Sequence, residues 1–167
     1  MERMRSARKM VLKVIGVCII ALFAFMTLIG TYQIVTRYFF NRPSTVSEEL
    51  LTYSFTWMSL LAAAYVFGKR DHMRMGFLAD QITGPARKII EVLIDGLSFA
   101  LAAVVMVYGG VAITKLTTIQ MTASLGVPMA YIYVIVPVTG LLIMVFSAMN
   151  AVDMLKRDFS EKGEAKI

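Results

Sequence analysis

Cysteine is almost absent from this chain of 167 residues, which has one, Cys18. A single cysteine cannot form an intrachain disulfide, and this excludes the four-helix thiol oxidoreductases of membranes, which need paired cysteines. Histidine also occurs once, at His72, with no second metal ligand at a usable spacing. We therefore expect His72 to be a hydrogen-bonded structural residue, and we predict no metal site.

The sequence also lacks the motifs of catalysis. It contains no phosphate-cradling loop, nucleophile elbow, metal-ligand cluster or Ser/His/Asp constellation. We predict that the protein is not an enzyme and needs no cofactor, and a membrane redox or hydrolytic enzyme is the least favoured class.

Apolar residues, by contrast, make up 58% of the chain, and the mean hydropathy is +0.71. This exceeds what a soluble core of this size needs and indicates a protein of the lipid bilayer. The net charge of +6 does not point to nucleic acid, because the 17 Lys and Arg residues are confined to short segments between long apolar runs. They are better explained as membrane flanks.

Four apolar segments are long enough to cross a membrane. Residues 14–36 are uncharged throughout and would extend about 34 Å as a helix, against a hydrocarbon core of about 30 Å. The other predicted spans are residues 50–67, 89–114 and 129–152, with a polar, turn-forming stretch before the last. The predicted fold is therefore all-α, a single four-helix membrane domain over residues 1–167.

The positive charges alternate with each crossing. Fourteen Lys and Arg residues fall on the side of the termini, and only Arg37, Arg42 and Lys115 fall on the other. Under the positive-inside rule, both termini should face the cytoplasm. Between spans two and three, apolar residues recur at helical spacing, which predicts a short amphipathic helix over residues 71–83 in the cytoplasmic interface. Pro137 is expected to bend span four.

Charged residues flank the turn between spans one and two. A cation at a helix end and anions at a helix start suit the helix dipoles, and Arg37 and the pair Glu48, Glu49 lie there. Thr45 and Glu48 fit a capping box. The leading interpretation is helix termination with an ion pair between Arg37 and one glutamate. Contact with another subunit and proton or substrate chemistry are the alternatives. Because adjacent glutamates differ by about 100° around a helix, we expect one to pair within the chain and the other to point elsewhere.

Two more polar residues lie inside predicted spans. Trp57 is about 13 Å deeper than Glu48, so its indole N–H needs a protein acceptor, either in this chain or in another subunit. Asp95 would cost up to about 2.5–3.5 kcal/mol at the centre of a span. We expect it to reach the headgroups or to pair with Lys88 or Arg87, a structural role being favoured over an ion site. Ser147 and Asn150 are further candidate hydrogen-bond partners.

The order and spacing of these motifs resemble the small, Q-type membrane subunit of tripartite ATP-independent periplasmic (TRAP) transporters over about residues 14–155. The stretches "RYFFNRPSTVSEELLTYSFTW", "KRDHMRMGFLADQI" and "SLGVPMAYIYVIVPVTG" carry the resemblance. One departure is that the family usually has a tryptophan just ahead of the two glutamates, where this chain has Thr45-Val46-Ser47.

The resemblance implies an accessory subunit of the bacterial inner membrane that braces the scaffold of a transporter. Its partners would be a large, M-type membrane subunit, a periplasmic substrate-binding protein and membrane lipids. The implied activity is sodium-driven uptake of an organic acid, such as a C4-dicarboxylate, sialic acid or a sugar acid. The alternative is a self-sufficient oligomeric transporter that uses Glu48 or Glu49. The candidate subunit-contact or structural residues are Arg37, Tyr38, Glu48, Glu49, Trp57, His72 and Asp95.

Overall fold

The computed structural model describes residues 2–69 and 85–155. Its helices, in chain order, are α1 (Glu2–Phe39), α2 (Thr45–Lys69), α4 (Pro85–Leu101), the π-helix η1 (Ala102–Gly109), α5 (Gly110–Leu116), α6 (Ala130–Tyr133) and α7 (Ile135–Leu155). The predicted amphipathic helix at residues 71–83, with His72, lies outside the described residues.

Four helical segments are long and apolar enough to cross a membrane, and they are Ser6–Phe39, Thr45–Lys69, Leu93–Leu116 and Ala130–Ala151. The third is built from α4, η1 and α5, and the fourth from α6 and α7. The prediction of an all-α protein with four transmembrane helices is thus confirmed for the described parts of the chain. In these described parts, the only β-type pairing is an isolated bridge between Met121 and Pro128.

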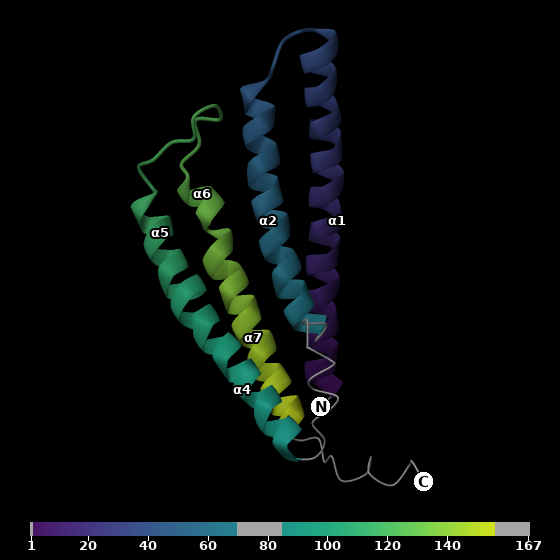
Figure 1. Ribbon diagram of the computed structural model, residues 1–167, viewed down its shortest axis with the longest axis vertical. Coiled ribbons are helices and arrows are strands. Elements are labelled where there is room, and N and C mark those ends of the chain that lie inside the picture. The colour runs from purple at the N-terminus through teal and green to yellow at the C-terminus, as the bar shows by residue number, and fades with distance from the viewer. Residues whose placement is uncertain (1, 70–84, 156–167) are drawn as a thin grey trace.

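The four spans lie side by side in a row. α1 packs against α2, α2 against α7, and α7 against α4 and η1 (Figure 1). The α1–α2 and α5–α6 connections lie at one end of the row, here called the loop end, and α1 begins and α2 and α7 end at the other, the terminal end. The buried core lies between α2, α7 and η1, around Ala64, Ala102 and Ile143. α7 is accordingly the most buried of the four spans.

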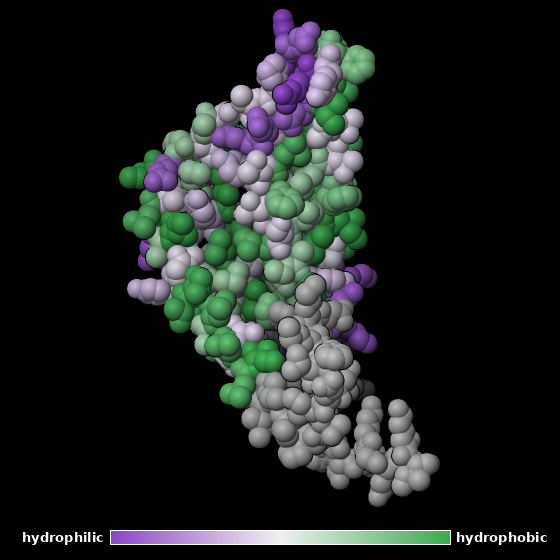
Figure 2. Space-filling view, in the orientation of Figure 1, coloured by the Kyte–Doolittle hydropathy of each residue, from purple (hydrophilic) through white to green (hydrophobic). Residues whose placement is uncertain are grey.

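Large apolar side chains remain exposed on the outer faces of the row. Leu28 on α1 and Leu97 on α4 are exposed by 71% and 72%. Figure 2 shows hydrophobic residues over most of the visible face, with hydrophilic residues gathered at the loop end. A patch of this extent needs lipid or another protein to cover it.

α2 begins one residue earlier than the predicted capping box requires. The Ser47 N–H donates to the Ser44 Oγ at 3.3 Å, and the Ser47 hydroxyl donates to the same oxygen at 2.9 Å. The N-cap is therefore Ser44. The predicted box of Thr45 and Glu48 is wrong, because Thr45 is already the first helical residue and a cap must stand just outside the helix. In the turn before it, Asn41 has a φ of +50°, a left-handed conformation that asparagine tolerates.

The third span changes its helical winding midway. Eight residues, Ala102–Gly109, form a π-helix, and the α-helix resumes at Gly110. The widened segment faces Gly140 of α7, where a Cβ would lie 2.7 Å from Met106 Cβ and 3.2 Å from its carbonyl carbon. η1 can approach α7 this closely because residue 140 has no side chain.

The fourth span is interrupted just before Pro137. α6 ends at Tyr133 and α7 begins at Ile135. Proline has no N–H to donate to the carbonyl four residues earlier, which here belongs to Tyr133. We predicted a bend at Pro137, and the structure places the irregularity within that preceding turn. α5 packs directly on the proline, since a Cβ on Gly110 would lie 2.8 Å from Pro137 Cδ.

Candidate functional site

The loop between α5 and α6 folds back on itself at the loop end of the row. The Thr122 N–H donates to the Val127 carbonyl at 2.9 Å, and the Val127 N–H donates to the Thr122 Oγ1 at 3.1 Å. Gly126 permits the reversal with a φ of +62°, a left-handed conformation that favours glycine. The tip of this loop, residues 123–126, is thereby presented to the start of α2 (Figure 1).

Glu49 binds the tip of that loop. Its Oε2 accepts the N–H of Ser124 at 3.1 Å and that of Leu125 at 2.9 Å. A carboxylate that accepts two backbone N–H groups makes charge-assisted bonds, which are stronger than neutral ones. Glu49 is half-buried, whereas Glu48 is exposed. Glu49 thus has its partners within the chain, in two backbone amides, while Glu48 is exposed.

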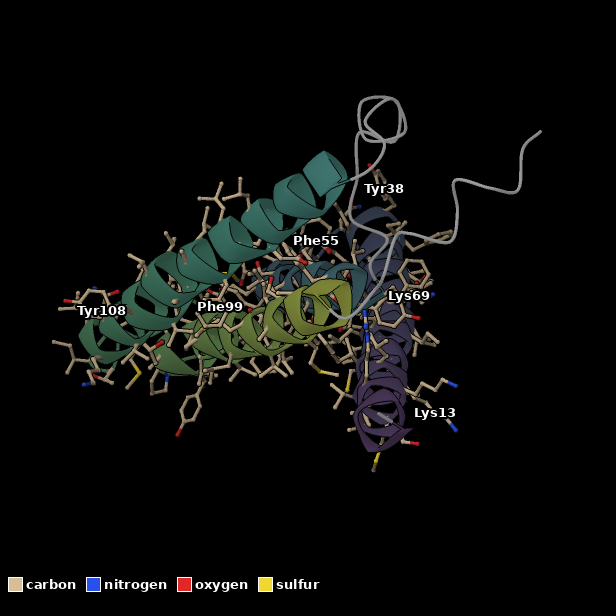
Figure 3. All side chains as sticks on the ribbon, turned by 90° about the horizontal axis from the view of Figure 1, so that it is seen from below. Lys13, Tyr38, Phe55, Lys69, Phe99 and Tyr108 are labelled. Carbon is tan, nitrogen blue, oxygen red and sulfur yellow. The ribbon has the colours of Figure 1, made fainter. Side chains whose placement is uncertain are left out.

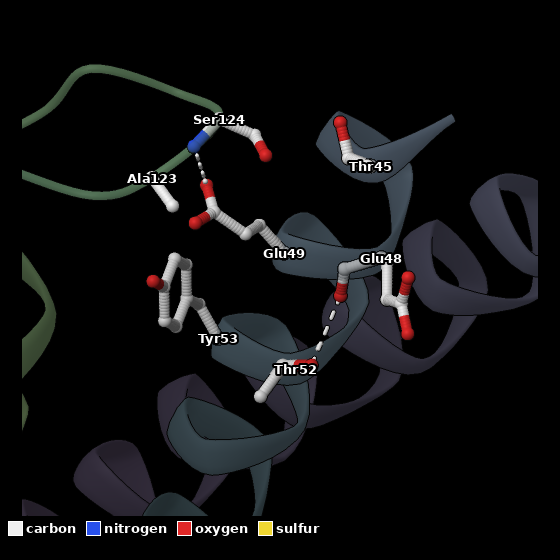
Figure 4. A pocket seen from close by; sticks show the side chains of 7 residues that line it. All are labelled: Thr45, Glu48, Glu49, Thr52, Tyr53, Ala123 and Ser124. Carbon is white, nitrogen blue, oxygen red and sulfur yellow. Dashed lines mark hydrogen bonds between the residues drawn. The ribbon is translucent and has the colours of Figure 1, made fainter. Parts of the chain in front are cut away.

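An open pocket of about 280 Å³ lies beside this contact. Its lining residues are Thr45, Glu48, Glu49, Thr52, Tyr53, Ala123 and Ser124. Figure 4 shows Glu49 and Tyr53 directed toward the loop and the Glu48 carboxylate turned away from it. The Thr52 hydroxyl donates to the Glu48 carbonyl at 2.9 Å, so it is used within its own helix.

Arg37 and Tyr38 both lie exposed near the end of α1. Among the described residues Arg37 forms no ion pair with Glu48 or Glu49, so the predicted pair across the turn is absent. The loop amides offer Glu49 two donors whose positions the backbone already fixes, whereas an ion pair would have to order a long arginine side chain. Tyr38 is 72% exposed and available to lipid or a partner.

Trp57 joins α2 to the interruption in span four. Its indole N–H donates to the Ile132 carbonyl at 3.1 Å. The expected protein acceptor therefore exists within this chain. It lies in α6, in the last turn before the helix is interrupted, where carbonyls lack their regular helical donors.

Three helices meet at the terminal end through Arg8 and Asn150. The Arg8 guanidinium donates to the Gly68 carbonyl, with Nε at 2.7 Å, and to the Asn150 Oδ1 at 3.0 Å. The Asn150 amide donates in turn to the Phe67 carbonyl at 3.2 Å. The last carbonyls of α2 have no intrahelical donors, and a cation there also suits the helix dipole. This arrangement, here called the Arg8 clasp, links α1, α2 and α7.

A family model of the tripartite ATP-independent periplasmic transporters, DctQ component, matches residues 26–157, which is most of the chain. The chain belongs to this family. Membership confirms the resemblance drawn from the sequence to a small TRAP membrane subunit. DctQ components are non-enzymatic membrane parts of transporters, in agreement with the prediction that the chain is not an enzyme.

Two relatives of this DctQ chain carry names of the same kind. A TRAP transporter small permease protein of Haemophilus influenzae is 26% identical over 92 residues, which is 55% of this chain and 57% of the relative. The sialic acid TRAP transporter small permease protein SiaQ of Vibrio cholerae is 30% identical over 84 residues, 50% of this chain and 49% of the relative. The chain thus spans about half the length of the curated relatives it matches.

The remaining predicted site residue of the DctQ chain, Asp95, is half-buried on α4. Its expected partners Lys88 and Arg87 lie where side chains are not described. Ser147 does not bond to Asp95, because its fully buried Oγ has no hydrogen-bond partner among the described residues. Within residues 2–69 and 85–155, no group of three or more His, Cys, Asp or Glu residues is placed to hold a metal ion.

Sequence reasoning missed Arg8 entirely. It counted this residue only as one of the positive charges before span one, because nothing in the sequence indicates which arginine of a basic flank will reach another helix. The Glu49 contact was also missed, although the polar loop that supplies its donors was recognised. A carboxylate at a helix start and a glycine-containing loop at the same membrane end are the signals that could have found it.

Proposed function

We propose that the chain is the small scaffold subunit of a sodium-driven TRAP transporter that takes up an organic acid. Its partners in this proposal are a large membrane subunit, which holds the substrate and sodium sites, and a periplasmic substrate-binding protein. The names of the two relatives support the class of transporter. That of the Vibrio cholerae protein makes sialic acid the first substrate to test, followed by C4-dicarboxylates and sugar acids.

The observation that carries the proposal is the way the chain uses its polar groups. Glu49, Trp57 and Arg8 each bond a backbone group of another element of the same chain. These bonds hold helices together and are not available to a transported solute. The outer faces of the row meanwhile expose large apolar side chains. A braced row with uncovered apolar faces suits a scaffold that packs against a larger membrane protein.

The same contacts disfavour a self-sufficient transporter built around the glutamates. Such a transporter needs a carboxylate that exchanges between proton and substrate. Glu49 already accepts two backbone N–H bonds, and Glu48 lies exposed in the first turn of α2, not at the middle of a span.

The proposed orientation places both termini, and therefore the terminal end of the row, in the cytoplasm. It rests on the fourteen Lys and Arg residues on that side against three on the other. The loop end, with Glu49 and the pocket beside it, would then face the periplasm and the binding protein.

Reconstitution of the three components in liposomes tests the proposal. The full chain, the large subunit and the binding protein, each from the same genome, are combined or omitted one at a time, and uptake of radiolabelled sialic acid is followed under an inward sodium gradient. We expect uptake only with all three components and the gradient. Uptake by liposomes that contain this chain alone would show that the proposal is wrong.

A further inference from the structure

Two arginines lie at the loop end of α1. Arg37 is in the last turn of the helix and Arg42 is in the connection to α2, and both are exposed. Neither guanidinium forms an ion pair or a hydrogen bond within the described parts of the chain. The two spans and their connection contain only two acidic residues beyond Glu2, and they are Glu48 and Glu49. Glu49 is already bonded to the α5–α6 loop, so the loop end of α1 carries uncompensated positive charge.

The turn after α1 holds the two arginines close together. The Arg42 N–H donates to the Thr36 carbonyl at 3.1 Å, and Thr36 is the chain neighbour of Arg37. The left-handed conformation of Asn41 reverses the chain just before this bond. Both side chains therefore start from the same closed turn, where one anion can meet both guanidinium groups.

The length of the apolar stretch places this turn at the level of lipid headgroups. Arg37 is the first charged residue after residues 14–36, which extend about 34 Å as a helix, against a hydrocarbon core of about 30 Å. Side chains on a helix lean toward its N-terminus, so those at the end of α1 lean back toward the membrane. The guanidinium of Arg37 thus lies just outside the hydrocarbon, where lipid phosphates lie.

Three exposed aromatic residues lie between the arginines. Tyr38, Phe39 and Phe40 are exposed by 72%, 79% and 67%. Figure 3 shows Tyr38 projecting outward from the end of α1, clear of α2 and α7. Because successive helical residues differ by about 100°, Tyr38 and Phe39 face different sides of the helix. A single protein surface covers one side of a helix, whereas lipid can surround the exposed sides of an outermost span. Aromatic rings at this level are also typical of a membrane–water interface.

Apolar side chains continue both sides into the membrane. Ile34 lies one turn before Tyr38 and Val35 one turn before Phe39, and they are exposed by 60% and 38%. A ligand for this end of α1 therefore needs an anionic group at the level of the arginines and an apolar body along the helix. A phospholipid has both, and a soluble anion has only the first.

We propose that Arg37 and Arg42 bind the headgroup phosphate of an anionic phospholipid, with Tyr38, Phe39 and Phe40 beside it at the interface. These five residues are here called the arginine turn. A guanidinium suits this role because its planar fork can donate two hydrogen bonds to one phosphate. A zwitterionic headgroup would bring its own cation next to the two arginines, whereas phosphatidylglycerol brings none. In the proposed orientation of the chain, this is a lipid of the periplasmic leaflet.

Photo-crosslinking from the arginine turn tests the site. Lipid binding has to be read locally, because the many Lys and Arg residues of the terminal end also attract anionic lipid. The photoreactive analogue p-benzoylphenylalanine takes the place of Phe40 in the full chain, in nanodiscs of equal parts dioleoyl phosphatidylglycerol and dioleoyl phosphatidylcholine. Mass spectrometry of the crosslinked peptide gives the ratio of the two lipids.

The expected ratio follows from the contribution of one arginine near an anionic lipid. With both arginines present it should be about 25 to 1 in favour of phosphatidylglycerol, and about 5 to 1 in Arg37→Gln or Arg42→Gln. The double Gln variant should crosslink the two lipids about equally.

Controls separate this site from general attraction to positive charge. Lys115→Gln removes an exposed lysine elsewhere at the loop end and should change the ratio by less than about twofold. Arg37→Lys with Arg42→Lys keeps both charges and should retain a ratio of at least about 10 to 1. Far-UV circular dichroism and size-exclusion profiles check that each variant is folded. In a complex copurified with the large subunit, the lipid adduct should remain the main product.

The proposal is overturned if the double Gln variant keeps the full preference, or if Lys115→Gln lowers it as much as Arg37→Gln does. Equal yields of the two lipids with both arginines present also overturn it. If inorganic phosphate abolishes the preference, the site takes a soluble anion, and if residue 40 crosslinks to the large subunit instead of lipid, it is a protein contact. Because the lipid ratio is measured without transport, its failure is distinct from a failure of the reconstituted uptake.

Discussion

Replacement of Glu49 by alanine should release the α5–α6 loop from α2. The carboxylate accepts the N–H groups of Ser124 and Leu125 at 3.1 and 2.9 Å. No other residue of the loop tip is held to α2 by a hydrogen bond among those found in the described chain. We therefore expect the loop to open locally while the helices stay packed.

The magnitude follows from the kind of bond lost. A hydrogen bond to a charged group contributes about 1.5–3 kcal/mol when it is well shielded. Glu49 is only half-buried, and water can reach the two amides once the loop opens. We therefore expect about 1–2 kcal/mol in total, which raises the open population of the loop by about 5- to 30-fold. Glu49→Gln keeps an acceptor oxygen but loses the charge, so its effect should be about half as large in free energy.

Hydrogen–deuterium exchange read by mass spectrometry measures this opening directly. A peptide that covers residues 117–129 should exchange faster in Glu49→Ala by the factor given above, at protein concentrations and detergent identical to those of the wild type. Peptides from α7 should exchange at the wild-type rate, because its core contacts are unchanged.

Glu48→Ala is the matched control, since Glu48 is the adjacent carboxylate and is exposed. It should leave loop exchange within about twofold of the wild type. Our reasoning is refuted if Glu49→Ala leaves the loop protected, or if the two alanine variants open it to the same extent.

Three further predictions concern helix packing and are read from thermal unfolding of the purified chain. Gly140→Ala should lower the free energy of unfolding by about 1–3 kcal/mol, because its new Cβ would overlap η1. Gly96 lies in open space on α4, so Gly96→Ala should be neutral or stabilising. Equal effects of the two variants would contradict the packing of η1 on Gly140. Trp57→Phe should cost about 1 kcal/mol through loss of the indole bond to α6, and an unchanged melting temperature would argue against that bond. Arg8→Ala should lower the free energy of unfolding by about 1–3 kcal/mol, because the last carbonyls of α2 lose their donor. Lys9 is exposed, and Lys9→Ala should lower it by less than about 0.5 kcal/mol. Similar losses for the two variants would show that the Arg8 clasp does not stabilise the fold.

The four membrane spans of the described chain could be predicted as helices because long uncharged stretches have one stable conformation in lipid. The fourth candidate span begins at Ala130, one residue after the start of the predicted span 129–152. The start of α2 was predicted less well, because Ser44 and Thr45 are both good caps and only the backbone shows which one stands outside the helix. The π-helix at Ala102–Gly109 was not predicted, since nothing in its apolar sequence distinguishes it from an α-helix.

The candidate site was harder to predict because its contacts join residues far apart in the chain. The depth of Trp57 in its span indicates that the indole N–H needs an acceptor. The acceptor is a backbone carbonyl 75 residues later, which the sequence does not identify. The sequence showed Glu49 only as a charge, and the leading interpretation paired Arg37 with one of the two glutamates, whereas Glu49 bonds to the backbone of the loop. A nearby opposite charge is visible in a sequence, whereas a pair of backbone donors on a folded loop is not.

The three long-range contacts of α2 explain why the spans form a braced row. Glu49 ties α2 to the loop at one end, Trp57 ties it to α6 farther along, and Gly68 and Phe67 meet the Arg8 clasp at the other end. Because Trp57 and Phe67 bond directly to the fourth span and Glu49 bonds to the loop just before it, α2 and the fourth span should move as one unit. α1 and α4 are then the outermost spans of the row, on either side of that unit, and each has one face against it and apolar side chains on the other. Such a row is held rigid by its polar contacts, and its apolar faces can pack against another membrane protein. A membrane scaffold needs both properties.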